Sequence, residues 1–403
     1  MKGFKAIFMV PAALIVAGAF AAGCSDSEES APTLLIKTNP VTAVASCAYL
    51  TVTAESDWVL TSTETWLSFD PAIGYGDDNA VIMNWDANSD ESSRSTTITI
   101  SDKDGRFSSY TLTQNASESS SSSSSGSTST ETTGTGQTST GLGWMELPET
   151  DASDGYEFFT HDMTVSGVST RNYSFYYDYD NYVAQWVAYP LSTWNKGSGS
   201  RTNAWAYDPL IDEDKQPNLA SGFKSGSTSY SYDRGHQIPS ADRYSTTAAN
   251  QATFYYTNMT PQLGSLNQYV WGNLEGAVRT WASESDTLYV LTGCVTTGST
   301  DYALDNDEKH ITIPTAYYKA LLRYAPESTL GYEGYMGIAF WFEHKTYGTS
   351  EAYKDHAISI AELEDALGFE LFVNLPDMVG ESTTTAIKAE DPLGSSDNAK
   401  WWW

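Results

Sequence analysis

The chain is organised around one charged stretch, Asp233-Arg234-Gly235-His236-Gln237-Ile238-Pro239, which lies between tyrosine-rich segments that resemble strands. Gly235 would let the backbone turn tightly or approach a ligand closely, because it has no side chain. Arg234 offers a planar guanidinium that suits a phosphate, and His236 can titrate near neutral pH. Together these residue types predict a site for phosphodiester chemistry.

Two further polar blocks follow in the same part of the chain, TNMTPQ at residues 257–262 and LNQYVWGNLE at residues 266–275. Asn267, Trp271 and Glu275 recur at i, i+4 and i+8, which predicts that they lie along one broad face of a helix. The apolar residues expected to pack this helix are Val270, Leu274, Ala277, Val278 and Trp281.

In this order, DRGHQxP, TNxTPQ and LNQxxWxxLE resemble the motifs of the DNA/RNA non-specific endonuclease family, whose site is a ββα-metal finger. The resemblance implies an endonuclease that hydrolyses DNA and RNA and leaves 5′-phosphate ends. It implies that His236 takes a proton from water as a general base, a role that typically contributes about 10²–10⁴-fold. Arg234 would bind the phosphate, and Asn258 would support the site through hydrogen bonds.

A second phosphate-binding arginine is expected just before a tryptophan, and this chain carries Arg201 in the segment GSRTNAW at residues 199–205. By its spacing to Trp205, however, Asn203 occupies the position where the resemblance places the arginine. Arg201, two positions earlier, is nevertheless the predicted second phosphate ligand. The alternative is that Arg201 is an exposed loop arginine outside the site.

The resemblance makes Asn267 the direct protein ligand of a divalent metal, through its side-chain oxygen. Glu275 would orient the ion from further out, through an intervening water. Magnesium suits such a site, because it keeps most of its waters and commonly takes one or two protein ligands, and manganese could substitute. The alternative is an ordinary solvated Asn and Glu on a helix surface. Structural roles are expected for the other histidines, His161, His310, His344 and His356.

Length and charge set limits on these predictions. A chain of 403 residues with 40% hydrophobic residues is long enough for two domains and a linker. Its net charge is −30, and residues 144–403 carry 15 Lys and Arg against 35 Asp and Glu, a net −20. This composition argues against a general nucleic-acid binder, which needs a basic surface. Any action on nucleic acid must depend on a local basic and metal-binding groove, and the acidity elsewhere suits solubility.

At the N-terminus two lysines precede an apolar run over residues 6–22, which is typical of a secretory signal rather than a spanning helix. Ala21-Ala22-Gly23-Cys24 resembles a bacterial lipobox. Residues 1–23 are therefore expected to be a lipoprotein signal peptide, with Cys24 lipidated and anchored in a membrane and residues 24–32 as an acidic tether. The predicted location is the cell envelope, as a surface-exposed outer-membrane lipoprotein. The alternative is cleavage after residue 21, which would give a secreted or periplasmic protein.

Residues 33–116 show short alternating runs separated by Asp, Asn, Gly and Ser, which is typical of a β-sandwich. The placing of Trp58, the Trp66-Leu67 pair and the closing TQNA at residues 113–116 resembles the BACON domain, an Ig-like sandwich. That resemblance implies glycan contact by exposed aromatic rings. The alternative is a spacer whose tryptophans fill the core. A second function follows from the glycan reading: a surface glycan-binding lipoprotein whose nuclease-like domain is inactive or acts on another phosphodiester.

Residues 117–143 are almost wholly Ser, Thr and Gly, which predicts a flexible linker that would let the next domain sweep a volume. The nuclease-like domain would occupy residues 144–390, followed by a polar tail over 391–403 that ends in three tryptophans. The expected fold is α+β, a ββα-metal nuclease domain with a mixed β core after an all-β Ig-like sandwich. Cys47 and Cys294, one in each domain, are expected to be buried thiols. Strands are expected at 171–178, 182–191, 287–293, 311–319 and 337–342, and a helix at 360–368.

Overall fold

The computed structural model describes residues 30–36, 39–43, 46–90, 92–117, 144–150, 155–165, 168–285, 287–325 and 334–403. The predicted signal peptide, the lipidation site Cys24 and the predicted linker lie outside these residues. Within this part of the chain, no helix is both long and apolar enough to cross a membrane.

The N-terminal domain consists of two four-stranded antiparallel sheets that share one apolar core. Along β7 the side chains at alternate positions are buried, which is the period expected of a strand with one face on a core. One sheet has the order β1 (Thr33–Ile36), β2 (Ser46–Thr53), β6 (Asp78–Trp85) and β4 (Leu67–Asp70). The other has the order β5 (Ile73–Tyr75), β3 (Asp57–Ser62), β7 (Arg94–Asp102) and β8 (Phe107–Gln114).

Both tryptophans considered as glycan contacts belong to this core. Trp58 is fully buried and donates from Nε1 to the carbonyl of Gly76 at 2.8 Å. Trp66 is also buried, and the Arg94 guanidinium lies 4.6 Å from its ring centroid. The structural alternative is therefore confirmed for these two rings, whereas the assignment to an Ig-like or BACON fold stays a prediction.

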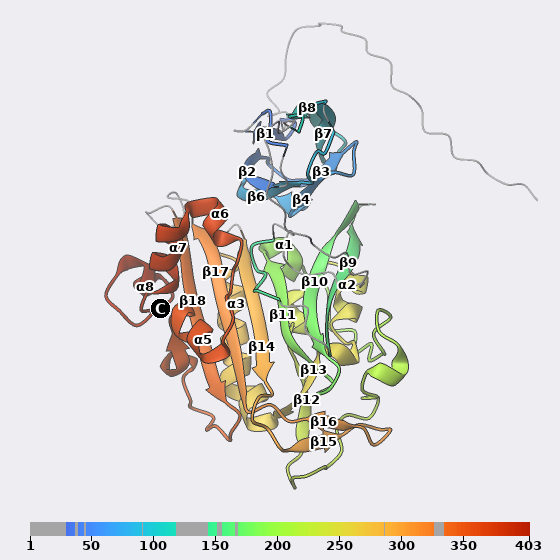
Figure 1. Ribbon diagram of the computed structural model, residues 1–403, viewed down its shortest axis with the longest axis vertical. Coiled ribbons are helices and arrows are strands. Elements are labelled where there is room, and N and C mark those ends of the chain that lie inside the picture. Colours follow the sequence, from blue (N-terminus) through green and yellow to red (C-terminus); the bar gives the residue numbers. More distant parts are fainter. Residues whose placement is uncertain are drawn as a thin grey trace, which may run out of the picture.

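The second domain is built on a seven-stranded antiparallel sheet with a helical layer on each face (Figure 1). Neighbouring residues alternate between two cores, so that Tyr176 and Trp186 face one layer and Tyr177 and Val187 face the other. The strand order is β19 (Ala357–Ile358), β18 (Gly334–Glu343), β17 (Ala316–Ala325), β14 (Leu288–Val295), β11 (Val183–Leu191), β10 (Val168–Asp178) and β9 (Tyr156–Val165). One face carries α5 (Ile360–Leu367), α6 (Leu375–Val379) and α7 (Glu381–Lys388), and the other carries α2 (Thr247–Ala252) and α3 (Gly272–Trp281).

Most of the strands expected in this domain are present. The segments predicted at 171–178 and 182–191 pair antiparallel as β10 and β11. The strand predicted at 311–319 is instead two strands, β16 (His310–Thr312) and β17, separated at Pro314. Proline lacks the N–H that a ladder position requires. β16 pairs with β15 (Tyr302–Leu304) at the edge of the domain.

The expected ββα order is present on the α3 side of the sheet. β12 (Tyr232–His236) pairs antiparallel with β13 (Met259–Leu263), and a helix follows. That helix differs from the regular one predicted, because its first turn, Leu266–Trp271, is a π-helix that continues into α3. The wider turn is closed by a hydrogen bond from the Gly272 N–H to the Asn267 carbonyl. Such π-turns are frequent at functional sites.

A buried charged cluster joins the two domains. Arg171 on β10 pairs through Nη2 with Asp70 of β4 and with Glu146, each at 2.5 Å. Its guanidinium also lies 3.9 Å from the centroid of the Trp144 ring. Ile82 of β6 is buried in the same core as residues of the second domain. The sandwich is thus seated at one end of the large sheet, beside α1 (Thr193–Lys196) (Figure 1), which differs from the freely sweeping arrangement that the linker composition predicted.

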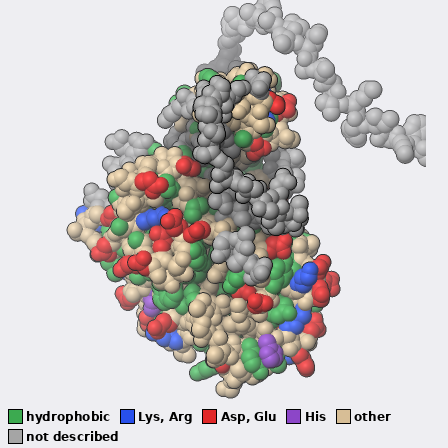
Figure 2. Space-filling model, in the orientation of Figure 1, with side chains coloured by type: hydrophobic (Ala, Val, Ile, Leu, Met, Phe, Trp, Pro, Cys, Tyr) green, Lys and Arg blue, Asp and Glu red, His purple; other side chains and the backbone are tan. Residues whose placement is uncertain are grey.

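The C-terminal tryptophans also pack on the domain. Helix α8 (Asp397–Trp401) precedes Trp402, which is 2% exposed and lies 5.1 Å from the ring of Trp281 on α3. Cys294 on β14 is a buried free thiol, as predicted, whereas the side chain of Cys47 lies outside the described residues. On the face shown in Figure 2, acidic side chains are scattered widely among few basic ones, in keeping with the net charge.

Candidate active site

Strand β12 delivers His236, and Asn258 fixes the chain just beyond it. The buried Asn258 amide donates to the carbonyls of Ile238 at 3.0 Å and Thr253 at 2.8 Å. Its Oδ1 accepts from the Ile238 N–H at 3.0 Å. Because these bonds occupy the side chain, Asn258 acts on the site by holding the backbone after His236.

Gly235 is needed here for close packing rather than for a turn. It lies inside β12, where a Cβ would come within 2.6 Å of the Cβ of Gln262 on the paired strand. Gln262 is itself buried, and its amide has no hydrogen-bond partner among the described residues. The pairing of β12 with β13 therefore depends on a residue without a side chain at position 235.

The His236 ring is held between two aromatic rings. Its centroid lies 5.5 Å from that of Trp205 and 5.1 Å from that of Phe254, both in edge contacts. Nε2 is shielded from solvent and has no hydrogen-bond partner within the described ranges. Burial, followed by the charge of Arg201, lowers the pKa of His236 to about 3, although a hydrogen bond with the Arg234 backbone opposes the shift. The ring is thus neutral at pH 7 and presents a nitrogen that can accept a proton.

Arg201 joins this cluster despite the imperfect spacing. Its guanidinium lies 4.7 Å from the centroid of Phe254 and 6.0 Å from that of Trp205. Asn203, which has a left-handed φ of 52°, accepts a hydrogen bond from Arg201 Nε at 2.8 Å. Asparagine tolerates this conformation better than most residues. The turn at Asn203 therefore directs Arg201 toward His236.

Arg234 reaches the same rings from β12. Its guanidinium lies 3.5 Å from the Trp205 centroid, and Nη1 donates to the Leu219 carbonyl at 2.9 Å. Arg234 and Arg201 therefore flank the same indole and both raise the local positive potential at His236. Two guanidinium groups beside a neutral imidazole suit the binding of a phosphodiester.

The helix side of the site supplies oxygen atoms. Asn267 donates from Nδ2 to Oδ2 of Asp233 at 2.9 Å, and Gln268 donates to the same oxygen at 2.7 Å. This contact fixes the orientation of the Asn267 amide, whose oxygen is the atom that the sequence predicted as a cation ligand. Asp233 thus braces the first turn of the helix.

Glu275 lies eight residues further along, where it is partly buried. Burial raises the pKa of the Glu275 carboxyl, and the charge of Lys319 on β17 opposes the rise. Lys319 is itself 0% exposed, and its Nζ has no hydrogen-bond partner in the described part of the chain, although it lies 4.8 Å from the Trp271 ring centroid. Burial lowers the pKa of Lys319, whereas the charge of Glu275 acts in the opposite direction. Each charge therefore favours the ionised form of the other.

A second buried carboxylate lies next to this pair. Asp242 accepts from the Tyr189 hydroxyl at 2.8 Å and from Arg279 Nη1 at 3.1 Å. Arg279 follows Glu275 by one helical turn on α3 and influences its pKa. The sequence predictions missed Lys319, Asp242 and Arg279. Arg279 could have been found by extending the helix face by four residues, and Lys319 by its position in an apolar strand, since a lysine is rarely buried without a partner charge.

The donor set suits a hard divalent cation with few protein ligands. Within the described ranges, no cluster of three or more His, Cys, Asp or Glu side chains could hold a metal ion. The amide oxygen of Asn267 and the carboxylate of Glu275 are the oxygen donors that the sequence predicted on this helix. Magnesium, which keeps several waters and takes one or two protein oxygens, fits such a set.

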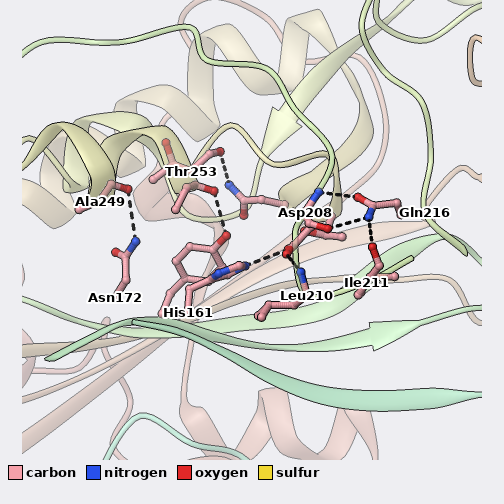
Figure 3. A network of polar contacts seen from close by, with 12 residues as sticks. His161, Asn172, Asp208, Leu210, Ile211, Gln216, Ala249 and Thr253 are labelled. Atoms are coloured by element: carbon pink, nitrogen blue, oxygen red, sulfur yellow. Dashed lines mark hydrogen bonds and ion pairs between the residues drawn. The ribbon is translucent and has the colours of Figure 1, made fainter. Parts of the chain in front are cut away.

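The remaining histidines have structural partners. His161 on β9 lies in the buried network of Figure 3, where its Nε2 is 2.9 Å from Oδ2 of Asp208. Gln216 bonds both the Asp208 backbone and the Ile211 carbonyl in the same network, which pins the loop beside the site. The expectation for His161 is therefore confirmed. The others contact neighbouring groups: His344 accepts from the Leu263 N–H at 2.9 Å, His356 stacks on Phe342 and His310 stacks on Tyr302.

Comparison with known proteins matches the same region. The profile of the family described as DNA/RNA non-specific endonuclease matches residues 155–378. The nuclease of Nostoc sp. strain PCC 7120 is 29% identical over 223 residues, which are 54% of this chain and 77% of that protein. The nuclease of Serratia marcescens is 27% identical over 236 residues, 58% of this chain and 81% of that protein. The mitochondrial nuclease of Saccharomyces cerevisiae is 27% identical over 197 residues, 46% of this chain and 58% of that protein.

Proposed function

The chain belongs to the DNA/RNA non-specific endonuclease family and is a phosphodiester-hydrolysing endonuclease, and we propose that it cuts DNA and RNA with His236 as general base. A single divalent cation, magnesium or manganese, serves as cofactor, and the products carry 5′-phosphate ends. The observation that carries this proposal is the neutral imidazole of His236, whose Nε2 is without a partner among the described residues and lies in a cluster with Arg201 and Arg234.

The proposed chemistry assigns each step to a side chain. The His236 imidazole takes the proton of the attacking water, since a base must be neutral to accept it. Arg201 and Arg234 hold the non-bridging phosphate oxygens and offset the charge that develops there. When bound, the divalent cation offsets charge on the phosphate and assists departure of the 3′ oxygen.

On the helix side, Asn267 would hold the cation through its oxygen, and Asp233 keeps that oxygen presented by binding the amide nitrogen. Glu275 would orient the ion from further out, and Lys319 favours the ionised carboxylate that this role needs. Supporting groups of this kind commonly change metal affinity by about 10–100-fold when they are removed.

A digestion assay tests this proposal. Supercoiled plasmid and a structured RNA would each be incubated with the full chain in magnesium, in manganese and in excess EDTA, and the ends of the products would be analysed. We expect internal cleavage of both substrates with either metal, 5′-phosphate ends, and loss of cleavage in EDTA. Cleavage that persists in EDTA would contradict the metal-dependent mechanism, and failure to cut either substrate would contradict the proposed function.

For location, we propose export and lipid anchoring at Cys24, with display at the outer surface. Support comes from the apolar run over residues 6–22 and the lipobox-like sequence at residues 21–24. Mass spectrometry of the mature N-terminus would test the anchor. A diacylglyceryl-modified Cys24 is expected, and an unmodified chain that begins at residue 22 would contradict it.

A further inference from the structure

A cleft opens between the two domains immediately beside the arginine side of the site. Its volume is about 720 Å³, within the range typical of ligand sites. On the nuclease side it is lined by residues 197–202 and 244–247, and on the sandwich side by Asp57 and Tyr75. Arg201, which also lies over Phe254 next to His236, forms part of its wall. The cleft therefore continues from the proposed phosphate position toward the sandwich.

The sandwich wall of this cleft is held in place by the contact between the domains. Asp70, which ends β4, makes the buried ion pair with Arg171, and β5 with Tyr75 follows a few residues later. The side chain of Tyr75 is 66% exposed, so its ring is available to a ligand. Tyr75 lies on β5, a short strand that pairs with β3, and not on a free loop.

The lining is polar and nearly neutral. Its charged residues are Arg201 and Asp57, whereas hydroxyl groups make up much of the remaining wall. Two of these hydroxyls, Oγ1 of Thr202 and Oγ of Ser245, are buried and have no hydrogen-bond partner among the described residues. The carboxylate of Asp57 disfavours a second phosphate in the cleft and leaves room for an uncharged polar group.

We propose that this cleft binds the nucleoside next to the scissile phosphate in an unpaired nucleic-acid strand, which deepens the proposed function and rests on it. Arg201 contacts the phosphate at one end, the Tyr75 ring stacks on the base, and hydroxyl groups of the polar wall bond the edges of the base or sugar. In a duplex the base is already stacked and paired, so the subsite serves single-stranded segments. The sandwich domain is thereby part of the substrate-binding surface.

Steady-state kinetics of the full chain on a single-stranded oligodeoxynucleotide would test the subsite. The variants are Tyr75→Ala, Tyr75→Phe and the matched control Phe107→Ala, which removes an aromatic ring that is 62% exposed on the same domain but does not line the cleft. Because loss of a stacking ring typically weakens binding by about tenfold, KM should rise roughly tenfold in Tyr75→Ala, while kcat stays within about twofold. Tyr75→Phe and Phe107→Ala should both match the wild type. Cleavage of a blunt duplex of the same sequence should be unchanged in all three variants.

The outcomes separate the subsite from the function on which it rests. A wild-type protein that cuts no nucleic acid overturns the proposed function. A wild-type protein that cuts, together with an unchanged KM in Tyr75→Ala, overturns the subsite alone. An equal rise of KM in Phe107→Ala, or an equal loss on the duplex, also overturns it, because either result would show a general surface effect. Melting temperatures of the variants, expected to equal that of the wild type, would exclude a folding defect.

Discussion

The two halves of the site control the charge of a titratable side chain in opposite ways. In the phosphate half, defined by His236, Arg201 and Arg234, a titratable ring is kept neutral between Trp205 and Phe254 by burial and by the adjacent positive charge. In the metal half, defined by Asn267 and the residues around Glu275, a carboxylate is balanced by a buried cation.

The two halves also differ in how far their residues lie from the sequence motifs. The phosphate half is contained in the motif and one loop, because aromatic rings and arginines act there directly. The metal half depends on Lys319 and Asp242, which lie outside the motif and act on Glu275 through charge. We therefore expect changes in the first half to affect the rate, and changes in the second half to affect metal affinity and stability.

The largest expected effect is that of His236→Ala. The variant should lose about 10²–10⁴-fold in kcat, since the proposed base is removed while the surrounding rings remain. Plasmid cleavage at saturating magnesium would measure the loss. His310→Ala is the matched control, because His310 is stacked on Tyr302 outside the site, and it should keep the wild-type rate. A near-wild-type rate in His236→Ala would contradict the expectation that changes in the phosphate half affect the rate.

In the metal half, Lys319→Met should destabilise the protein, by up to about 3 kcal/mol, because Glu275 would lose the cation that compensates it. Urea denaturation in EDTA would measure the free energy of unfolding. The double variant Lys319→Met with Glu275→Gln should recover most of that loss, since no unpaired charge would remain. Equal losses in the single and the double variant would show that the two charges are not coupled.

Stability against pH tests the buried state of His236. Its folded pKa of about 3 lies below the unfolded value of 6.5, so between these values the unfolded chain binds the proton more readily. The wild type should therefore lose stability relative to His236→Asn as pH falls from about 6 to 4, at a slope approaching about 1.4 kcal/mol per pH unit. Above pH 6.5 the difference should be constant. A flat difference over the whole range would mean that the ring is solvated.

The smallest effect is expected from deletion of residues 25–143. Both halves of the site lie after Trp144, so the remaining chain should keep kcat within a few-fold of the wild type on saturating plasmid. The change removes Asp70 from the Arg171 cluster, while Glu146 remains to pair with the guanidinium. Kinetics of the purified 144–403 fragment would measure this. A folded fragment without activity would show that the sandwich contributes to the chemistry itself.

Residues that act through local sequence were predictable. The order β12, β13 and helix follows from three blocks that are close along the chain, and the paired strands β10 and β11 follow from alternation. For Trp58 and Trp66 the sequence allowed two positions, in the core or on the surface in contact with glycan. It could not decide between them, because it does not say which face of a strand meets the core.

What could not be predicted depends on geometry between distant segments. The position of Arg201 depends on the left-handed backbone at Asn203, which spacing to Trp205 does not reveal. Lys319 and Glu275 lie more than forty positions apart in the sequence, on β17 and α3. The π-turn at Leu266–Trp271 and the seating of the sandwich through Arg171 likewise depend on tertiary contacts.

The division between the halves is tested most directly by titrating magnesium in the plasmid assay for two variants side by side. Asn267→Ala should raise the half-activating magnesium concentration by about tenfold or more, because the proposed protein ligand is lost. His236→Ala should lower the maximal rate and leave the half-activating concentration within about twofold of the wild type. An unchanged titration in Asn267→Ala, or the same shift in both variants, would contradict the separate roles assigned to the two halves.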